Sequence, residues 1–323
     1  MKDSYLNNTV LHLDWEALRK MGAEQVDEKG IYRGKVREVL DLGSRLLIFT
    51  SDRISAFDKV LSTIPSKGEI LNKLSLFWFH ETADIIQNHI IEEVSPRSVL
   101  VRKCKTLPIE VIVRGYLTGS AWRAYEKGED ISGYKLPEGM KMNQAFDKPL
   151  LTPTTKAEGG EHDMPITRDQ ILSQKLVSEP IWNAVEEAAM KLFQKGTEIA
   201  NKQGLILVDT KYEFGISEGE LYVVDEIHTQ DSSRYWYMDS YQECFDKGED
   251  QRKLDKEFFR KWLMDKNFMG DGKAPEITDE VRLQIMERYL EAYKVITGRE
   301  FQPSGISPQE ELELIAQRLR CCL

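Results

Sequence analysis

The sequence predicts an α+β fold, with a strand-rich first part, a mixed middle part and a helical end. Two observations carry this prediction. The period of the hydrophobic residues changes along the 323 residues from that of strands to that of helices, and the regular βαβ alternation of a dinucleotide-binding fold is absent. The phosphate-loop patterns GxxxxGK followed by Ser or Thr, and GxGxxG, are absent as well. Any nucleotide site in this chain therefore has to be built on another framework.

The first part, from about Gly30 to Arg114, is expected to consist mainly of strands. Segments 31–41 and 45–50 flank Asp41-Leu42-Gly43-Ser44, a sequence typical of a hairpin turn. Segments 99–101 and 109–113 are expected to pair with each other across residues 105–108. One helix, over about 72–87, interrupts the strands because apolar residues recur there at helical spacing.

The middle part mixes helices and strands. Its expected elements are a helix over 118–127, a long helix over about 180–202, and a hairpin of segments 205–214 and 220–227. Ser120 is a plausible N-cap for the first helix, and Gly204 stands where a glycine often ends a helix. Residues 137–165 are rich in Pro, Gly and Thr and are expected to form a long loop, which is usually functional or mobile.

The last part, from about residue 239, is expected to be helical. Helices are predicted over 255–264, from Thr278 to about Thr297, and from Ser307, where Ser-Pro-Gln-Glu has the pattern of a capping box.

Composition and charge predict a soluble protein of about two domains. Hydrophobic residues make up 41% and charged residues 30% of the chain. The 44 basic and 54 acidic residues give a net charge of −10, which argues against non-specific binding to nucleic acid or to an anionic membrane. No apolar run reaches the roughly 20 residues of a membrane helix, and residues 1–9 do not resemble a signal peptide. The four cysteines form no metal-binding or disulfide pattern, so a cytoplasmic location is expected.

The hairpin at residues 205–227 carries the strongest candidate site. Asp209, Lys211 and Glu213 alternate, so they project from one face of a strand, and the turn is expected to place Asp225 roughly opposite Asp209. Carboxylates gathered around a lysine are unfavourable unless something binds them, and their oxygens suit Mg²⁺ shared with nucleotide phosphates. A solvated hairpin end with surface ion pairs explains the alternation about equally well. The segment Asp231-Ser232-Ser233-Arg234 favours a site, because it adds ligand-type groups at the hairpin exit.

Three further segments are candidates, each with a simpler alternative. In Gly34-Lys35-Val36-Arg37 the two cations share a strand face and glycine allows a ligand to approach the backbone, but a basic edge strand is the simpler interpretation. Residues 109–120 place Arg114 at a strand end and Ser120 at a helix start, which suits a phosphate monoester, although N-capping alone explains the serine. Residues 51–58 form a polar loop after a buried strand, where an Asx turn would explain Asp52.

Seven segments, in order along the chain, resemble one family. They are GKVREV (34–39), SDRISAFD (51–58), EVIVRGYLTGSAW (110–122), LTPTTKAEGGEHD (151–163), LVDTKYEFG (207–215), VVDEIHTQDSSRYW (223–236) and LDKEFFR (254–260). They extend over most of the chain, and no single segment decides the match. By these segments the chain resembles the SAICAR synthetases, or phosphoribosylaminoimidazole-succinocarboxamide synthases, of purine biosynthesis.

The resemblance implies a carbon–nitrogen ligase that uses ATP and Mg²⁺. Such enzymes join L-aspartate, through its amine, to the carboxylate of carboxyaminoimidazole ribonucleotide, and they release ADP and phosphate. A carboxylate is a poor electrophile at neutral pH, so the γ-phosphate has to activate it before the amine attacks. Charge neutralisation and positioning should supply most of the acceleration.

The same resemblance implies which residues bind ATP and the metal. Lys35 and Lys211 would contact the ATP phosphates, with Arg37 as a helper, and Glu110 would lie near the adenosine. Glu213 and Asp225 would hold Mg²⁺, in agreement with the argument from the hairpin.

For the ribonucleotide, the resemblance implies a grip on the 5′-phosphate by Arg114, Ser120, Arg234 and Lys256. Facing the imidazole, the carboxylate or the incoming amine would be Ser55, Asp58 and Asp231. Lys156 and Asp163 lie on the long loop, which could order over the substrates. The candidates for catalytic roles are Lys211, Asp209 and Asp231, and no single general base is assigned.

The family fold is α+β and related to ATP-grasp, with an N-terminal antiparallel β lobe, a second α+β lobe, the ATP cleft between them, and C-terminal helices. Residues 1–115 are therefore predicted to form the β-rich lobe that covers ATP. Residues 116–238 are predicted to form the central lobe with the Mg²⁺, ATP and substrate residues, and 239–323 a helical region packed on the core. The chain length predicts a monofunctional enzyme whose partners are its small-molecule substrates, not nucleic acid or a membrane. The sequence leaves the oligomeric state open.

Two other functions compete with this prediction. One is a different ATP-dependent carboxylate–amine ligase, against which the three phosphate-type groups Arg114, Ser120 and Arg234 argue. The other is a nucleotide-binding module without turnover, which loss of Glu213, Asp225 or Lys211 would have favoured. A protein-kinase-like phosphotransferase is disfavoured because the sequence has no HRD and no DFG segment.

Overall fold

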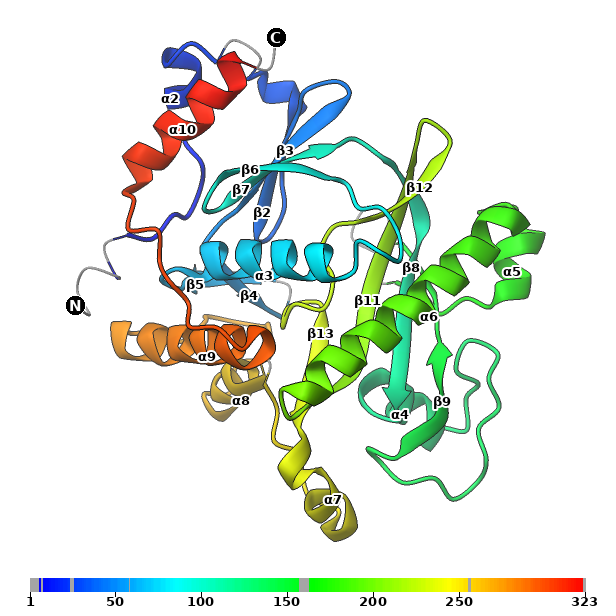
Figure 1. Cartoon of the computed structure of the whole chain (residues 1–323). Helices are drawn as coiled ribbons and strands as arrows, with labels where there is room; N and C mark the ends of the chain where they lie inside the picture. Colours follow the sequence, from blue (N-terminus) through cyan, green and yellow to red (C-terminus); the bar gives the residue numbers. More distant parts are fainter. Residues whose placement is uncertain are drawn as a thin grey trace. The chain divides into compact units, whose positions relative to one another are not determined.

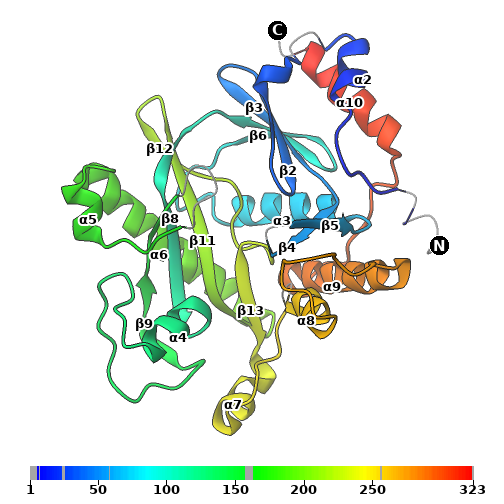
Figure 2. The ribbon, with the colours of Figure 1, turned by 180° about the vertical axis from the view of Figure 1, so that it is seen from behind.

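The computed structural model describes residues 6, 8–23, 26–57, 59–156, 163–254 and 257–321 of the chain. The chain divides into two compact units, one formed by residues 1–77, 89–103 and 256–323 and the other by residues 78–88 and 104–255. The predicted α+β class is confirmed, because antiparallel sheets combine with helices and the chain ends in helices (Figures 1 and 2). Each of these units is assembled from separate stretches of the chain, whereas the predicted domains 1–115, 116–238 and 239–323 are continuous. The division into these three domains stays a prediction.

The first unit is centred on a five-stranded antiparallel sheet with the order β1-β2-β3-β7-β6. Its strands are β1 (Ile31–Arg33), β2 (Arg37–Asp41), β3 (Arg45–Thr50), β6 (Ile90–Ser95) and β7 (Ser98–Arg102). Leu40, Leu47 and Phe49 are fully buried in a core that α2 (Trp15–Lys20) and α10 (Pro308–Arg320) help to form. These two helices contact each other, and α10 also contacts β6 (Figure 1).

The other elements of the first unit follow the sequence closely. They are η1 (Glu28–Gly30), the two-stranded sheet of β4 (Arg53–Ala56) and β5 (Lys59–Thr63), and the helices α8 (Glu257–Asp265) and α9 (Asp279–Thr297). The helix α3 (Lys67–Glu81) belongs to the first unit up to residue 77 and to the second unit from residue 78. The predicted C-terminal helices are confirmed: Thr278 caps α9, and Ser307 and Glu310 form the capping box of α10. The helix predicted over 72–87 is observed earlier in the chain, as α3.

The second unit is built on a sheet with the order β10-β8-β11-β12, in which β9 also pairs with β8 and β13 with β11. Its strands are β8 (Lys105–Tyr116), β9 (Ala145–Leu151), β10 (Thr154–Thr155), β11 (Leu205–Ser217), β12 (Glu220–Val224) and β13 (Ser233–Tyr237). Its helices are α4 (Gly119–Glu126), α5 (Arg168–Ser173), α6 (Glu179–Lys202) and α7 (Met238–Lys247). The long amphipathic helix α6 buries Trp182, Val185 and Leu192 and packs on β8 and β11 (Figures 1 and 2).

A β-bulge decides which side chains of β11 face α6. The bulge lies between Leu207 and Asp209, where the pairing with β13 shifts register. Before the bulge, Leu207 lies close to Gly196 of α6. Beyond the bulge, Tyr212 faces α6, because it contacts His228, which also lies close to Gly196. The side chains at 209, 211 and 213 therefore project from the face of the sheet that α6 does not cover.

Two predictions about the connections are wrong. Segments 99–101 and 109–113 do not pair, because residues 103–104 lead the chain from one sheet to the other: β7 pairs with β3 and β6, and β8 pairs with β9, β10 and β11. Residues 137–165 are not a single loop, since β9 and β10 lie within them and extend the second sheet. Of the helices that the structure describes, none is long and apolar enough to cross a membrane.

Candidate active site

The pairing of β8 with β11 brings the predicted charged residues together on one sheet face. In the register of these strands Asp209 lies opposite Arg114, and Glu213 lies opposite Glu110. On the other side of β11, Arg234 of β13 lies opposite Asp209. Since directly paired residues share a face, three neighbouring strands carry their charges to one surface. The predicted common face of Asp209, Lys211 and Glu213 is consistent with this register.

Lys211 lies at the centre of a group of carboxylates. Its Nζ is 3.0 Å from Glu110 Oε1, 2.5 Å from Glu213 Oε1 and 3.8 Å from Asp225 Oδ2. Lys156 Nζ approaches the second oxygen of Glu213 at 2.5 Å. Three carboxylates and two ammonium groups give this cluster, which we call the carboxylate–lysine cluster, a formal charge of −1. The expectation that Asp225 lies opposite Asp209 is wrong, because Glu213 pairs with Val224, so Asp225 follows β12 close to Lys211.

The electrostatics of the cluster raise the pKa values of both Lys211 and Glu110. Burial lowers the pKa of Lys211, but the charges of Glu213, Asp225 and Glu110 outweigh it, so that its pKa is raised. Burial is the largest influence on Glu110 and raises its pKa, and Glu213 and Asp163 add to the rise against the opposing effect of Lys211. This interaction also brings the predicted residue Asp163 into the surroundings of the cluster.

A second group, which we call the arginine cluster, lies at the other end of the same strands. Arg114, 7% exposed, donates from Nε to Thr152 Oγ1 (2.9 Å), from NH1 to Asp209 Oδ2 (3.3 Å) and from NH2 to Ser120 Oγ (3.1 Å). Arg234 Nε lies 3.4 Å from the other oxygen of Asp209. The predicted trio Arg114, Ser120 and Arg234 is therefore brought together, with Asp209 bridging the arginines.

The arginine cluster has the charge that a phosphate monoester requires. Burial lowers the pKa of Arg114, and the nearby positive charges of Arg234 and Arg123 lower it further, whereas Asp209 raises it. Three arginines and one aspartate leave a formal charge of +2. Arg123, on α4, was not singled out by the sequence, because a helical arginine four residues after a glycine carries no special pattern. The N-cap prediction for Ser120 is wrong: Thr118 is the N-cap, and Ser120 lies in the first turn.

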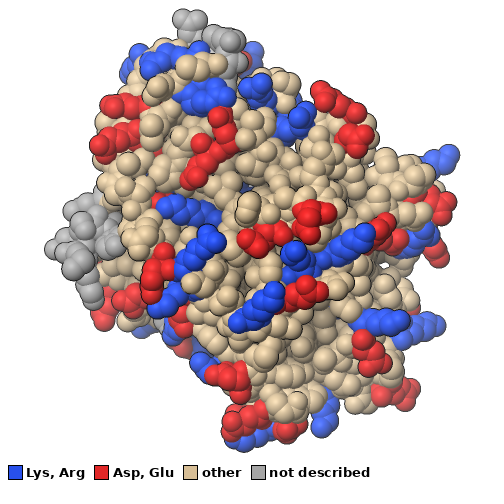
Figure 3. Space-filling model, viewed as in Figure 1, with Lys and Arg blue, Asp and Glu red and all other residues tan. Residues whose placement is uncertain are grey.

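Charges of both signs are mixed on the surface drawn in Figure 3. Lysine and arginine side chains are interspersed there with aspartate and glutamate. The net charge of −10 is therefore not gathered into one acidic patch on this face. Local groups such as the two clusters, and not the net charge, decide whether an anion can bind.

A buried histidine ties the strand that carries the clusters to the loop after β12. Tyr212 lies between Lys211 and Glu213 in sequence, and its OH is 2.5 Å from His228 Nε2. Burial lowers the pKa of His228 to about 3, so its ring is neutral. Tyr235 OH donates to the His228 backbone carbonyl at 2.6 Å. The sequence did not single out this histidine, since its burial depends on distant residues such as Gly196 of α6 and Trp78.

The remaining predicted site residues belong mainly to the first unit. Lys35 lies in the turn between β1 and β2, so the expectation of one strand carrying both Lys35 and Arg37 is wrong: Arg33 pairs with Glu38, and residues 34–37 turn the chain. Ser55 lies on β4. Asp58 and Lys256 lie outside the described residues. In the second unit, Asp231 lies in a turn in which its N–H donates to Thr229 Oγ1 at 3.3 Å.

The donor set of the carboxylate–lysine cluster fits Mg²⁺ better than a transition metal. Within the described ranges, no three His, Cys, Asp or Glu side chains form a preformed metal centre. Mg²⁺ does not require one, because it is commonly bound by one or two carboxylates together with waters and substrate phosphates. Glu213 and Asp225 supply such carboxylates, and the Lys211 ammonium already occupies a cationic position between them.

Comparisons with known proteins agree with the geometry. The model of the SAICAR synthetase family matches residues 30–277. A phosphoribosylaminoimidazole-succinocarboxamide synthase of Bacteroides fragilis is 47% identical over 309 residues, which cover 94% of this chain and 96% of the relative. Its counterpart in Cytophaga hutchinsonii is 44% identical and covers 92% and 97%, respectively. Among solved structures, SAICAR synthase of Saccharomyces cerevisiae complexed with SAICAR is 36% identical, with a TM-score of 0.75 and coverage of 84% and 95%. A SAICAR synthetase in complex with ADP is 25% identical, with a TM-score of 0.63 and coverage of 84% and 100%.

Proposed function

The chain belongs to the SAICAR synthetase family, and from this premise we propose which of its residues bind each substrate and the metal. The activity is an ATP-dependent ligation in purine biosynthesis. It joins L-aspartate to the carboxylate of carboxyaminoimidazole ribonucleotide and releases ADP and phosphate. The observation that supports this assignment of residues is the presence of two charge clusters of opposite sign on one sheet face.

We assign the arginine cluster to the 5′-phosphate of the ribonucleotide. Arg114 and Ser120 point toward each other, and Arg234 is packed so closely over Gly119 that a Cβ at that glycine would lie 2.1 Å from its NH1. Guanidinium groups bind phosphate through two parallel hydrogen bonds, and the formal charge of +2 matches a phosphate dianion. Asp209 orients both arginines, and this role is better supported than that of a general base. Lys256 stays a predicted contributor.

We assign the carboxylate–lysine cluster to the ATP phosphates and the metal. Glu213 and Asp225 would hold Mg²⁺, which when bound would offset the negative charge of the phosphates. Lys211 is charged and would contact a phosphate, and Glu110 would lie toward the nucleoside. Lys156 and Asp163 flank this cluster from the segment after β10. Lys35 and Arg37 stay predicted contributors to the binding of the ATP phosphates.

The family implies a reaction in two steps, in which we propose roles for these residues. The substrate carboxylate attacks the γ-phosphate, the bond between that phosphate and ADP breaks, and an acyl phosphate or a closely related transition state forms. The aspartate amine then attacks the acyl carbon, inorganic phosphate leaves, and the amine loses a proton to form the amide. Lys211 would stabilise charge on the transferred phosphate, while Asp231, Ser55 and Asp58 would face the imidazole carboxylate or the amine.

The decisive test measures ADP release with Mg·ATP, the ribonucleotide and L-aspartate, omitting each in turn. Release that requires all three, with the succinocarboxamide product seen by mass spectrometry, supports the proposal. ATP binding without turnover would favour a silent nucleotide-binding module, and turnover with another acid would favour a different carboxylate–amine ligase. We also propose a cytoplasmic location, which is consistent with the absence of disulfides among the three cysteines that the structure describes.

A further inference from the structure

Arg53 holds the turn that carries Lys35. Arg53 Nε donates to the carbonyl oxygen of Lys35 at 2.9 Å, and NH2 donates to that of Gly34 at 2.9 Å. NH2 also lies 3.5 Å from the carbonyl oxygen of Arg37. One guanidinium therefore contacts three of the four carbonyl groups of the turn, and its side chain is only 2% exposed.

The remaining contacts of the turn complete the same arrangement. The Val36 carbonyl accepts from Ser51 N–H (3.0 Å) and from Ser51 Oγ (2.5 Å). The Arg37 carbonyl accepts from Gly34 N–H at 2.8 Å. All four carbonyl oxygens of residues 34–37 are thus hydrogen-bonded, and each of them is reached by Ser51 or Arg53 of the segment Ser51-Asp52-Arg53.

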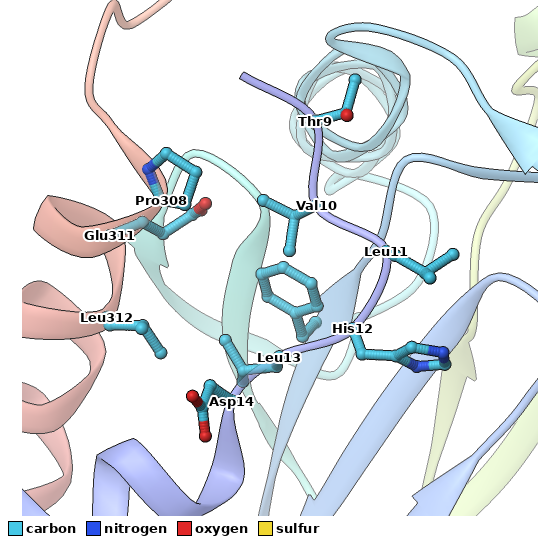
Figure 4. A pocket seen from close by; sticks show the side chains of 10 residues that line it. Thr9, Val10, Leu11, His12, Leu13, Asp14, Pro308, Glu311 and Leu312 are labelled. Atoms are coloured by element: carbon cyan, nitrogen blue, oxygen red, sulfur yellow. The ribbon is translucent and has the colours of Figure 1, made fainter. Parts of the chain in front are cut away.

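Arg53 is itself fixed from the opposite side. Its NH1 lies 2.7 Å from Glu38 Oε1, a carboxylate that is completely buried and also accepts from Trp15 Nε1. NH1 further contacts the Leu11 carbonyl and the His12 ring. Residues 11 and 12 belong to a segment that lines a cavity of about 290 Å³ with α10, and Figure 4 shows the His12 ring on the side of this segment away from Glu311 and Leu312. The guanidinium therefore has little freedom to move.

A turn that contacts phosphates needs its carbonyl oxygens directed elsewhere, because a carbonyl dipole repels an anion. Binding all four carbonyls to donors of the protein meets this requirement before the ligand arrives. It also fixes the point from which the Lys35 side chain starts. Only a planar fork with several N–H groups can reach three carbonyls and a carboxylate together, and a lysine cannot do so with one nitrogen atom.

We propose that Arg53, assisted by Ser51, is a positioning residue that orders the turn at residues 34–37 for the phosphates of ATP. The inference rests on the proposed contact between Lys35 and ATP. Arg53 would touch neither substrate nor metal, and it would act through the backbone of the turn.

The test compares Arg53→Lys with Arg97→Lys in the purified full chain. Arg97 is a matched control, since it is also 2% exposed and lies in the same unit, where it is paired with Asp52 and Glu311. Arg53→Lys keeps the charge beside Glu38 but loses the fork, and it is expected to raise the KM for Mg·ATP by roughly tenfold. The KM values for the ribonucleotide and aspartate should change less than threefold. Arg97→Lys should lower the thermal midpoint to a comparable degree and leave the KM for Mg·ATP within about twofold.

Lys35→Met and the double variant Lys35→Met/Arg53→Lys separate the inference from its premise. If Lys35→Met raises the KM for Mg·ATP and the double variant adds little to it, the two residues act through one turn. If Lys35→Met raises this KM and Arg53→Lys does not, Arg53 only supports the fold and the inference is overturned while the proposed site stands. If Lys35→Met leaves the KM unchanged, both the contact and the inference are overturned. Independent, additive effects would also overturn it.

Discussion

Replacing Glu213 by glutamine tests the assignment of the carboxylate–lysine cluster. The substitution keeps the shape of the side chain and removes one negative charge. Two ammonium groups approach this carboxylate at 2.5 Å, so an amide there would accept from one lysine and present its own N–H groups to the other. The formal charge of the cluster would change from −1 to 0, which weakens its attraction for a cation.

The expected loss follows from what the charge does in the reaction. Removing one preorganised electrostatic group from an active site commonly lowers kcat by roughly 10²–10³-fold, or about 2.7–4 kcal/mol. The Mg²⁺ concentration for half-maximal rate should rise as well. Because Glu213 is only 9% exposed, the free energy of unfolding should fall by about 1–3 kcal/mol. ADP release measured over a Mg²⁺ series, together with thermal unfolding, provides all three quantities.

Glu311→Gln is the matched control. Glu311 is 1% exposed and accepts from Arg97 and from Ser95, so the same substitution breaks a buried ion pair in the first unit. It should lower stability to a similar extent and leave kcat within about twofold. A Glu213→Gln enzyme with kcat within threefold of wild type would refute the metal assignment. An equal loss of kcat in both variants would show that the effect is one of stability.

Three further outcomes are expected. Gly119→Ala should displace Arg234, because the new Cβ would lie 2.1 Å from its NH1, and should raise the KM for the ribonucleotide roughly tenfold without changing that for ATP; steady-state kinetics check this. Tyr212→Phe should lower the free energy of unfolding by about 1–3 kcal/mol, measured in urea, since it leaves His228 Nε2 buried without its hydrogen-bond partner. The pKa of His228 is about 3 in the folded chain, against 6.5 as its ordinary value, so the unfolded chain binds the extra proton between these values. As the pH decreases between these values, the free energy of unfolding of the wild type should fall by about 1.4 kcal/mol per pH unit, in addition to any fall seen in His228→Gln. Parallel curves of unfolding free energy against pH for the two proteins would contradict this expectation.

Local alternation made part of the site predictable. The common face of Asp209, Lys211 and Glu213 depends only on the geometry of one strand, and the bulge at Leu207 lies just before them, so it does not disturb their spacing. Arg114 and Ser120 were also predicted together, because five intervening residues turn a strand end into a helix start. The family resemblance then related these local patterns to specific substrates.

Pairing between segments was harder to predict. The position of Asp225 depends on the register of the hairpin, and β11 continues to Ser217, which places Val224 opposite Glu213. The sequence gives no sign of how far each strand runs before the turn. Similarly, β7 and β8 are neighbours in sequence but belong to different sheets. The sheet that each strand joins depends on the strands available to pair with it, and not on its own residues alone. The contact of His228 with Tyr212 is unpredictable for the same reason.

Three of the cations proposed to bind phosphates are paired with carboxylates of the protein itself. Lys211 is held by Glu213 and Glu110, and both Arg114 and Arg234 are held by Asp209. Isolated cations in such partly buried positions would be unfavourable, so these pairs stabilise the folded chain. Phosphate binding is then an exchange of partners, in which the anion must compete with a carboxylate for each cation. The free energy gained on binding is accordingly smaller than the number of new hydrogen bonds suggests, and a metal that engages Glu213 would favour the exchange by releasing Lys211 to the phosphate.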